Sequence, residues 1–298
     1  MTEASPDAPL DSVHITDVGP RDGLQNEQGV IPLDSKVKLV EALAAAGLTE
    51  IEIGSFVRPD VIPQLADSAD LFTSIDRRPG VLYTALVPNQ RGLDRALEVA
   101  VDKVAVFTSA SEGFAQANVN GSIADTIDRF RPVLLGAHAA GRKVRGYVSC
   151  VIACPYDGPT DHARVRAVCE QLLELGVDEI DLGDTIGVAK PADIDRLLGG
   201  LEGLLEPGEI VLHLHDTSGT AVACAERALQ LGVRRFDASC GGLGGCPFAP
   251  GSPGNLATEA LLDLCERMGF QTGVSRAAVA EASRAICSIL GVEPRGTG

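Results

Sequence analysis

The fold is decided by the stretch Leu172-Leu173-Glu174-Leu175-Gly176-Val177-Asp178-Glu179-Ile180-Asp181-Leu182. It reads as the end of a helix, a glycine at a tight turn, and a short strand rich in apolar residues. Glycine suits the left-handed residue that often closes a helix. The same order recurs in Ala46-Gly47-Leu48 and in Leu231-Gly232-Val233. We infer that the chain is built from repeated units of strand and helix.

Short segments rich in Val, Ile and Leu, bounded by Gly, Pro, Asp or Ser, are predicted as strands. The predicted strands are Val13–Val18, Glu50–Ile53, Val81–Val87, Lys103–Phe107, Val144–Ser149, Glu179–Leu182, Ile210–Leu214 and Arg235–Ser239. Between them, apolar residues spaced by three and four predict helices. The predicted helices are Asp34–Ala46, Arg91–Ala100, Ile123–Ala140, Asp161–Leu175, Ser218–Leu231 and Asn255–Met268.

Eight strand–helix units in 298 residues predict a (β/α)8 TIM barrel, an α/β fold. A doubly wound open sheet is the alternative, but no strand is followed by the Gly-x-Gly-x-x-Gly loop typical of that fold. We expect a single catalytic barrel over residues 12–290, which includes an appended C-terminal helix over Ala277–Leu290. Residues 1–11 and 291–298 are expected to be flexible tails.

Composition excludes several classes of partner. Asp and Glu number 41 against 25 Lys and Arg, and the resulting formal net charge of -16 repels nucleic acid and anionic lipid. No stretch approaches the apolar length of a membrane helix, and the first residues lack the pattern of a signal peptide. The eight cysteines form no Cys-x-x-Cys pair, which indicates reduced thiols. We therefore expect a cytoplasmic protein that binds neither nucleic acid nor membrane.

The clearest functional signal is His213-Leu214-His215, at the end of the seventh predicted strand. Side chains two apart on a strand share one face. Both imidazoles are therefore expected to point into the barrel, while Leu212 and Leu214 face the helices. Two of the five histidines of the chain share this face. Two imidazoles at this spacing can reach one ion, so the pair favours a metal site over a buried polar pair.

Polar residues end three other strands, where the active site of such a barrel lies. The first strand is followed by Arg21 and Asp22 in a glycine-rich loop, for which a solvated turn with a local ion pair is the alternative. Glu52 takes an inward position on the second strand, where a carboxylate is costly unless it is paired. Arg21 is its expected partner, and a glutamate that reaches solvent is the alternative. Asp184 ends the sixth strand, where an ordinary turn or helix-capping aspartate is the alternative.

A loop rich in glycine and proline follows the eighth strand, from Cys240 to Gly254. It is longer than an ordinary connection, which predicts a mobile lid that carries Cys246 over the site. The alternative for Cys246 is an incidental small residue. Asn255 then opens the expected eighth helix, where capping that helix is its simplest role.

The candidate ligands indicate which metal would bind. His213, His215, the carboxylate of Asp22 and the amide oxygen of Asn255 form a mixed nitrogen and oxygen set, which suits Mg²⁺ or Mn²⁺. A zinc hydrolase is the alternative, although it would favour more His or Cys. A Schiff-base aldolase is not expected, because Lys190 alone among the five lysines falls near the carboxyl ends of the strands.

Five motifs, spread over nearly the whole chain, resemble the 3-hydroxy-3-methylglutaryl-CoA lyases. The motifs are Asp17-Val18-Gly19-Pro20-Arg21-Asp22-Gly23-Leu24-Gln25-Asn26-Glu27, Gly146-Tyr147-Val148-Ser149-Cys150, Gly183-Asp184-Thr185-Ile186-Gly187, His213-Leu214-His215-Asp216-Thr217 and Gly242-Leu243-Gly244-Gly245-Cys246-Pro247-Phe248. A wider family of metal-dependent barrels shares the Arg-Asp and His-x-His elements. The Gly-Leu-Gly-Gly-Cys-Pro lid resembles the lyase branch in particular.

The resemblance implies cleavage of 3-hydroxy-3-methylglutaryl-CoA to acetoacetate and acetyl-CoA. It implies that Arg21 stabilises charge on the thioester oxygen and that Cys246 protonates the enolate carbon. Glu52 and Asp184 would hold Arg21 and His213 in position. Asp22 and His213 are both candidates for the base that removes the hydroxyl proton. The implied metal ligands are Asp22, His213, His215 and Asn255.

Some features depart from the resemblance. Pro250 and Pro253 are expected to stiffen the lid, and Phe248 stands where tyrosine is common in related lyases. The alternatives are a lyase for a longer 3-hydroxyglutaryl-CoA analogue, a condensing synthase and a pyruvate-type metal aldolase. An acyl-CoA is the expected small-molecule partner, and the appended helix favours a homodimer.

Overall fold

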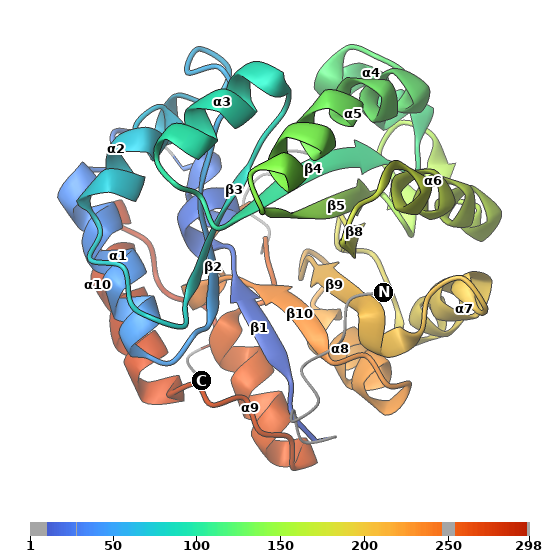
Figure 1. The fold of residues 1–298 in the computed structure, drawn as a ribbon. Coiled ribbons are helices and arrows are strands. Elements are labelled where there is room, and N and C mark those ends of the chain that lie inside the picture. Colours follow the sequence, from blue (N-terminus) through green and yellow to red (C-terminus); the bar gives the residue numbers. More distant parts are fainter. Residues whose placement is uncertain (1–10, 28, 246–253, 297–298) are drawn as a thin grey trace.

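Eight parallel strands close into a barrel in the computed structural model, which describes residues 11–27, 29–245 and 254–296 (Figure 1). The strand order around the barrel is β1-β10-β9-β8-β5-β4-β3-β2. Each strand lies on a predicted segment, so the (β/α)8 barrel is confirmed. The barrel strands are β1 (His14–Asp17), β2 (Glu50–Ser55), β3 (Leu82–Leu86), β4 (Lys103–Ser109), β5 (Lys143–Ser149), β8 (Glu179–Asp184), β9 (Ile210–Leu214) and β10 (Arg235–Ala238).

Helices surround the barrel on its outside (Figure 1). They are α1 (Leu33–Ala45), α2 (Ser68–Ser74), α3 (Gln90–Glu98), α4 (Glu112–Val119), α5 (Ile123–Ala139), α6 (His162–Leu175), α7 (Pro191–Leu201), α8 (Ala221–Gln230), α9 (Thr258–Met268) and α10 (Arg276–Leu290). The helices α2 and α4 were not predicted, because each is too short to show a helical pattern of apolar residues. No range is predicted for α7 either. None of the described helices is long and apolar enough to cross a membrane.

The appended helix α10 packs beside α1 (Figure 1). Beyond it, residues 291–296 of the expected C-terminal tail lie against the barrel. The backbone N–H of Val292 donates to the carbonyl of Cys287 at 3.0 Å, and that of Arg295 donates to the carbonyl of Gly241 at 2.9 Å. These contacts bring the end of α10 to the start of the glycine-rich loop at the barrel mouth.

Glycine at the helix ends is required by the backbone. Gly176 closes α6 with φ 102°, and Gly47 and Gly232 have φ of 104° and 101°. A side chain on Gly47 would also bring its Cβ within 2.5 Å of the carbonyl oxygen of Gly273. The repeated glycine therefore ends each helix and turns the chain into the next strand, as the sequence predicts.

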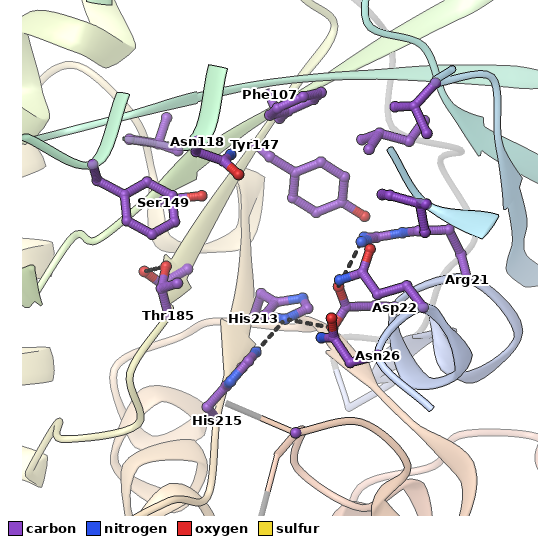
Figure 2. Close-up of a pocket in the computed structure, with 18 of the residues that line it drawn as sticks. Arg21, Asp22, Asn26, Phe107, Asn118, Tyr147, Ser149, Thr185, His213 and His215 are labelled. Atoms are coloured by element: carbon purple, nitrogen blue, oxygen red, sulfur yellow. Dashed lines mark hydrogen bonds and ion pairs between the residues drawn. The ribbon is translucent and has the colours of Figure 1, made fainter. Parts of the chain in front are cut away.

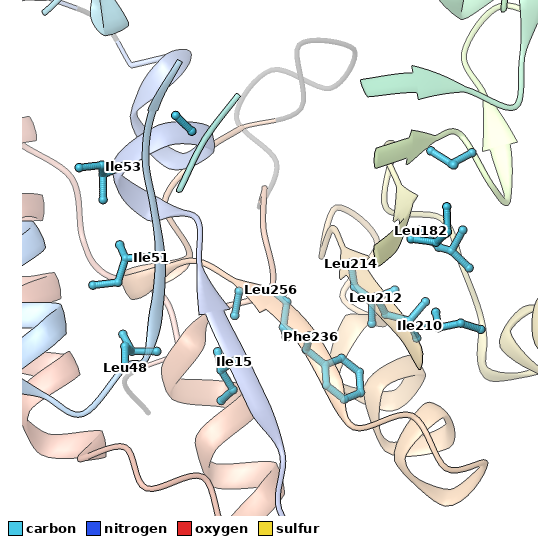
Figure 3. Packing of buried hydrophobic residues seen from close by; sticks show 14 of the residues in the cluster. Ile15, Leu48, Ile51, Ile53, Leu182, Ile210, Leu212, Leu214, Phe236 and Leu256 are labelled. Carbon is cyan, nitrogen blue, oxygen red and sulfur yellow. The ribbon is translucent and has the colours of Figure 1, made fainter. Parts of the chain in front are cut away.

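The strands bury apolar side chains on one face and polar side chains on the other. Ile51, Ile53, Leu212 and Leu214 point outward into the layer between barrel and helices (Figure 3). Because neighbouring strand residues point to opposite faces, the residues between them point into the barrel. The structure thus has the facing that the sequence predicts for Glu52 and His213.

A network of buried charges fills the barrel below its mouth. Arg145 is 2% exposed, and its guanidinium donates to Glu179 at 2.5 Å, to Asp237 at 2.8 Å and to Glu50 at 2.9 Å. The ammonium of Lys103 lies 2.7 Å from Glu50 and 2.6 Å from Glu179. Each charge in this layer has a partner of opposite sign, so the network is tolerated in the interior.

The replacement Arg145→Met is expected to lower the free energy of unfolding by about 3–5 kcal/mol, because it leaves buried carboxylates without their cation. Urea denaturation followed by circular dichroism measures this change. Arg58→Met is the matched control, since Arg58 pairs with Asp60 on the surface and its side chain is 75% exposed. The control should leave the denaturation midpoint unchanged. An equally small effect for Arg145→Met would contradict the claim that Arg145 stabilises the buried carboxylates.

Candidate active site

A pocket of about 390 Å³ opens where the strands reach their carboxyl ends (Figure 2). Arg21 and Asp22 line it from the loop after β1, and His213 and His215 line it from the end of β9. Tyr147 of β5 also lines the pocket, with its ring centre 5.6 Å from the guanidinium carbon of Arg21 and 6.2 Å from the ring centre of His213. The ends of β1 and β9, both predicted to carry function, therefore meet in one cavity, at the face of the barrel where such enzymes hold their active sites.

The loop after β1 holds Arg21 and Asp22 in a single π-helical turn, η1 (Gly19–Gly23). The guanidinium of Arg21 donates to Glu52 through Nε and Nη2, both at 2.5 Å, and to Asp22 through Nη1 at 2.5 Å. The expected pairing of Arg21 with Glu52 is present. Burial alone would lower the pKa of Arg21, but the carboxylates of Glu52 and Asp22 raise it, so the guanidinium stays charged.

Asp22, His213 and His215 form a group that can hold a metal ion. One ligand atom from each lies within 4.8 Å of the others. The Nε2 atoms of the two histidines are 3.2 Å apart, and Asp22 Oδ2 is 3.9 Å from Nε2 of His213. Convergence of three such side chains from the loop after β1 and the end of β9 is typical of a cation site.

The protonation states of two members of this group, Asp22 and His215, suit a cation. Burial lowers the pKa of the third, His213, but the hydrogen bond to Asp237 and the charge of Asp22 outweigh burial and raise that pKa above its ordinary value. Burial raises the pKa of Asp22, but Arg21 and the two histidines outweigh it and lower that pKa to about 2. Burial, together with His213, lowers the pKa of His215 to about 4. At neutral pH the pocket therefore offers an ionised carboxylate and a neutral imidazole, which are the forms that bind divalent cations. Nδ1 of His215 is buried without a hydrogen-bond partner among the described residues.

Asn255 lies beside this group but not at the start of a helix. The expectation that it opens the eighth helix is wrong, because α9 begins at Thr258. Asn255 instead bridges to the backbone of His215, and its side-chain N–H donates to Asp22 at 2.8 Å and to the carbonyl of Leu243 at 3.1 Å. The extended bridge draws the chain across the pocket before the helix starts. The amide thus lies next to the predicted ligands.

Comparisons with known proteins show which family the chain belongs to. The model of a family described as HMGL-like matches residues 12–286. The chain is 47% identical over 279 residues to the 3-hydroxy-3-isohexenylglutaryl-CoA/hydroxy-methylglutaryl-CoA lyase of Pseudomonas aeruginosa, with 94% of this chain and 93% of the relative covered. It is 43% identical over 290 residues to the mitochondrial hydroxymethylglutaryl-CoA lyase of Macaca fascicularis, with 97% and 89% covered. The chain belongs to the hydroxymethylglutaryl-CoA lyase family.

A solved structure supports the same assignment. The crystal structure of hydroxymethylglutaryl-CoA lyase from Pseudomonas aeruginosa matches with a TM-score of 0.94 and 45% identity, over 96% of each chain. As a member of the hydroxymethylglutaryl-CoA lyase family, the chain is an enzyme, and the resemblance stated from its five motifs is confirmed.

One supporting acid in this lyase family member is placed differently from the prediction. Asp184 was expected to hold His213, but it pairs in register with Leu214, whereas His213 pairs with Gly183. Asp184 therefore lies on the outward face of β8. Its carboxylate accepts from the backbone N–H of Ala189 at 2.8 Å and so fixes the loop that leads into α7.

The acid that contacts His213 is Asp237 of β10, which the sequence analysis did not single out. Asp237 Oδ2 lies 3.2 Å from Nδ1 of His213 and 3.2 Å from the hydroxyl of Tyr147. That hydroxyl is also 3.3 Å from Glu52. Burial, with the carboxylates of Asp237 and Glu52, raises the pKa of Tyr147 well above its ordinary value, so the phenol stays neutral. Alternation along β5 and β10 is the signal that could have identified both residues, since each takes an inward position.

Cys246 lies outside the described residues of the lyase. The residue before it in the chain, Gly245, lines the pocket. On the far side of the loop, Gly254 packs against Gly244. The role of Cys246 in this family member stays a prediction.

Proposed function

We propose that this chain cleaves 3-hydroxy-3-methylglutaryl-CoA to acetyl-CoA and acetoacetate, with Mg²⁺ or Mn²⁺ bound by Asp22, His213, His215 and Asn255. The observation that carries the proposal is the convergence of Asp22 and the two histidines beside Arg21 in one pocket. The substrate is taken from the names of the relatives, and the pocket offers a candidate cation site and an arginine that suit its cleavage. A divalent cation at these residues would lower the pKa of the substrate's C3 hydroxyl and stabilise negative charge on oxygen.

Asp22 is the group best placed to take the C3 hydroxyl proton. Both nitrogens of His213 are engaged, Nδ1 with Asp237 and Nε2 with His215, each at 3.2 Å. The carboxylate of Asp22 has two oxygens with several lone pairs, so it can bind and still accept a proton. As the proton leaves, the C3–O bond becomes a carbonyl and the C2–C3 bond breaks. The product that carries the new carbonyl is acetoacetate.

Arg21 stabilises the charge that this cleavage creates. The electron pair of the C2–C3 bond moves to the thioester enolate, whose oxygen gains negative charge. Contacts with Glu52 and Asp22 occupy three of the five N–H donors of the guanidinium, which keeps donor capacity for that oxygen. A fixed, charged donor aimed at developing charge lowers the barrier. The thiol of Cys246 then gives its proton to C2, and acetyl-CoA forms.

A longer acyl chain is a second candidate substrate, favoured by the apolar side of the pocket. Val57, Val61, Ile62, Leu86 and Phe107 line that side. The relative at 47% identity is named for both an isohexenyl and a methyl substrate. Each buried CH₂ contributes about 0.8 kcal/mol, so a longer 3-alkyl chain that uses this wall would show a lower KM than the 3-methyl substrate.

The reaction is tested by supplying 3-hydroxy-3-methylglutaryl-CoA and, separately, a 3-isohexenyl analogue to the purified protein with Mg²⁺. Equal amounts of acetyl-CoA and the corresponding keto acid are expected from the methyl substrate. Cleavage of the longer substrate alone would assign the second candidate. No cleavage of either substrate, together with condensation when an acyl-CoA and a keto acid are supplied instead, would contradict both and favour a synthase.

The replacement Cys246→Ser is expected to lower kcat about 10²-fold, because an alcohol is a much weaker acid than a thiol and general-acid catalysis contributes at least that much. Isothermal titration with Mn²⁺ should give the same affinity as for the unaltered protein. The matched control is Cys169→Ser, since Cys169 is buried in α6 away from the pocket. Turnover of Cys246→Ser equal to that of the control would rule out the acid role.

Three further expectations concern the binding partner, the oligomeric state and the cellular location. An acyl-CoA is the expected small molecule, and the homodimer and the cytoplasmic location stay predictions. Analytical ultracentrifugation of the full chain measures the oligomeric state directly, and the sedimentation coefficient of a dimer is expected.

A further inference from the structure

The face of His213 that points away from the pocket lies against a carboxylate. Asp237 is the register partner of His213 on the neighbouring strand, so both side chains enter the barrel at the same level. Asp237 Oδ2 lies 3.2 Å from Nδ1 of His213. A carboxylate can only accept a hydrogen bond, so this contact requires the proton of the imidazole to be on Nδ1.

The other oxygen of Asp237 accepts a hydrogen bond from Arg145, a group that can donate but cannot accept. Nη1 of Arg145 donates to Oδ1 of Asp237 at 2.8 Å. Arg145 is itself fixed by Glu50 and Glu179, and its side chain is 2% exposed. A guanidinium carries donors and no acceptor. The carboxyl group of Asp237 is therefore locked with Oδ1 toward Arg145 and Oδ2 toward His213.

The opposite nitrogen of His213 faces the candidate metal ligands. Nε2 lies 3.2 Å from Nε2 of His215 and 3.9 Å from Oδ2 of Asp22. In the neutral ring with its single proton on Nδ1, this atom carries the lone pair that a cation needs. Figure 2 shows the ring of His213 turned toward His215 and Asp22.

We propose that Asp237, locked by Arg145, is a positioning residue that keeps the proton of His213 on Nδ1 and its lone pair on Nε2. The inference rests on the proposed cation-dependent function, since it explains why His213 presents a ligand atom to the pocket. It assigns a part in the reaction to a residue that does not line the pocket. Partners of this kind orient a histidine ligand and raise its affinity for the ion.

The replacement Asp237→Asn tests the proposal because the neighbouring Arg145 allows the new amide only one orientation. Arg145 only donates, so the amide oxygen must face Arg145 and the NH₂ group must face His213. The hydroxyl of Tyr147, which donates to Oδ2 of Asp237, can donate to Glu52 instead. That NH₂ group donates to Nδ1, which moves the imidazole proton to Nε2. The side chain keeps its size and shape, but His213 is then in the tautomer that cannot bind a cation through Nε2.

Asp181→Asn is the matched control. Asp181 is a buried carboxyl in the same layer, 3.5 Å from Nη1 of Arg145. Burial, together with Asp237, raises the pKa of Asp181 well above its ordinary value, so that side chain is already neutral. Asparagine therefore reproduces its charge, and the control changes the same layer without reversing a donor toward His213.

The tautomer is measured by ¹⁵N NMR of the metal-free protein labelled at histidine. The chain has five histidines, and single replacements of the others assign the His213 signals. Protonated Nδ1 is expected for the unaltered protein and for Asp181→Asn, and protonated Nε2 for Asp237→Asn. Titration with Mn²⁺ should show an affinity 10- to 100-fold lower for Asp237→Asn alone, within the range for such partners.

A neutral His213 with its single proton on Nε2 in the unaltered protein, measured at a pH above the pKa of His213, would overturn the proposal, even if Asp237→Asn failed to fold. An unchanged tautomer in Asp237→Asn, or an equal change in Asp181→Asn, would overturn it too. The NMR measurement uses neither substrate nor metal. Failure to cleave 3-hydroxy-3-methylglutaryl-CoA would therefore refute the proposed function without deciding the tautomer, and the two failures are distinguishable.

Discussion

Arg21→Gln is expected to lower kcat by about 10³-fold. Loss of one fixed hydrogen-bond donor to developing charge costs about 10²–10³ in kcat, and Arg21 supplies a full positive charge as well. The contact strengthens as the thioester oxygen gains charge, so kcat and kcat/KM should fall together. Steady-state rates of acetoacetate release measure both parameters.

The fold should survive this change because Glu52 can respond to it. Burial raises the pKa of Glu52 even with Arg21 beside it, so without that cation the carboxyl takes up a proton. Arg21→Lys keeps the charge but loses the planar fork that contacts Glu52 and Asp22 together, and it should recover only part of the rate. A value of kcat within tenfold of the unaltered protein for Arg21→Gln would contradict the role of Arg21.

His215→Ala is expected to remove the bound ion and to lower turnover by about 10³-fold or more. An ion at this place contributes several kcal/mol to stabilising charge, and each 1.36 kcal/mol corresponds to a tenfold change in rate. The replacement removes one of three converging ligand atoms. Metal content after dialysis against Mn²⁺, together with the rate, gives the two readouts.

His138→Ala is the matched control for His215→Ala. His138 pairs with Asp178 on the surface at 3.0 Å, and its side chain is 41% exposed. Both metal content and rate should stay as in the unaltered protein. If His215→Ala retained its ion, the ligand set would be wrong, and if it lost the ion but kept its rate, the cation would have no part in the chemistry.

The fold could be predicted because its signals are local. A glycine between helix and strand, and apolar residues at alternate strand positions, depend on neighbours a few residues away, as around Gly176. The same alternation placed Glu52 and His213 inside the barrel. Helices as short as α2 and α4 leave too few apolar residues to show a period, and their presence depends on packing against the strands.

The site could be predicted where motifs end strands, but not where residues from distant strands meet. Asp237 appears in the sequence as an ordinary charge within a short strand. Its significance comes from Arg145, which is 92 positions away in the chain and reaches it only across the closed barrel. The resemblance implies that Asp184 holds His213, yet the register of β8 against β9 turns Asp184 to the opposite face.

The central claim is that a cation held by Asp22, His213 and His215 drives cleavage in this pocket. It is tested most directly by stripping the protein of metal and titrating Mn²⁺ back while bound ion and acetoacetate release are measured together. The rate should rise in proportion to the bound ion and reach its limit when a single ion is bound per chain, with no such response in His215→Ala. Cleavage at full rate by the stripped protein, or occupancy of the site without any gain in rate, would contradict the claim.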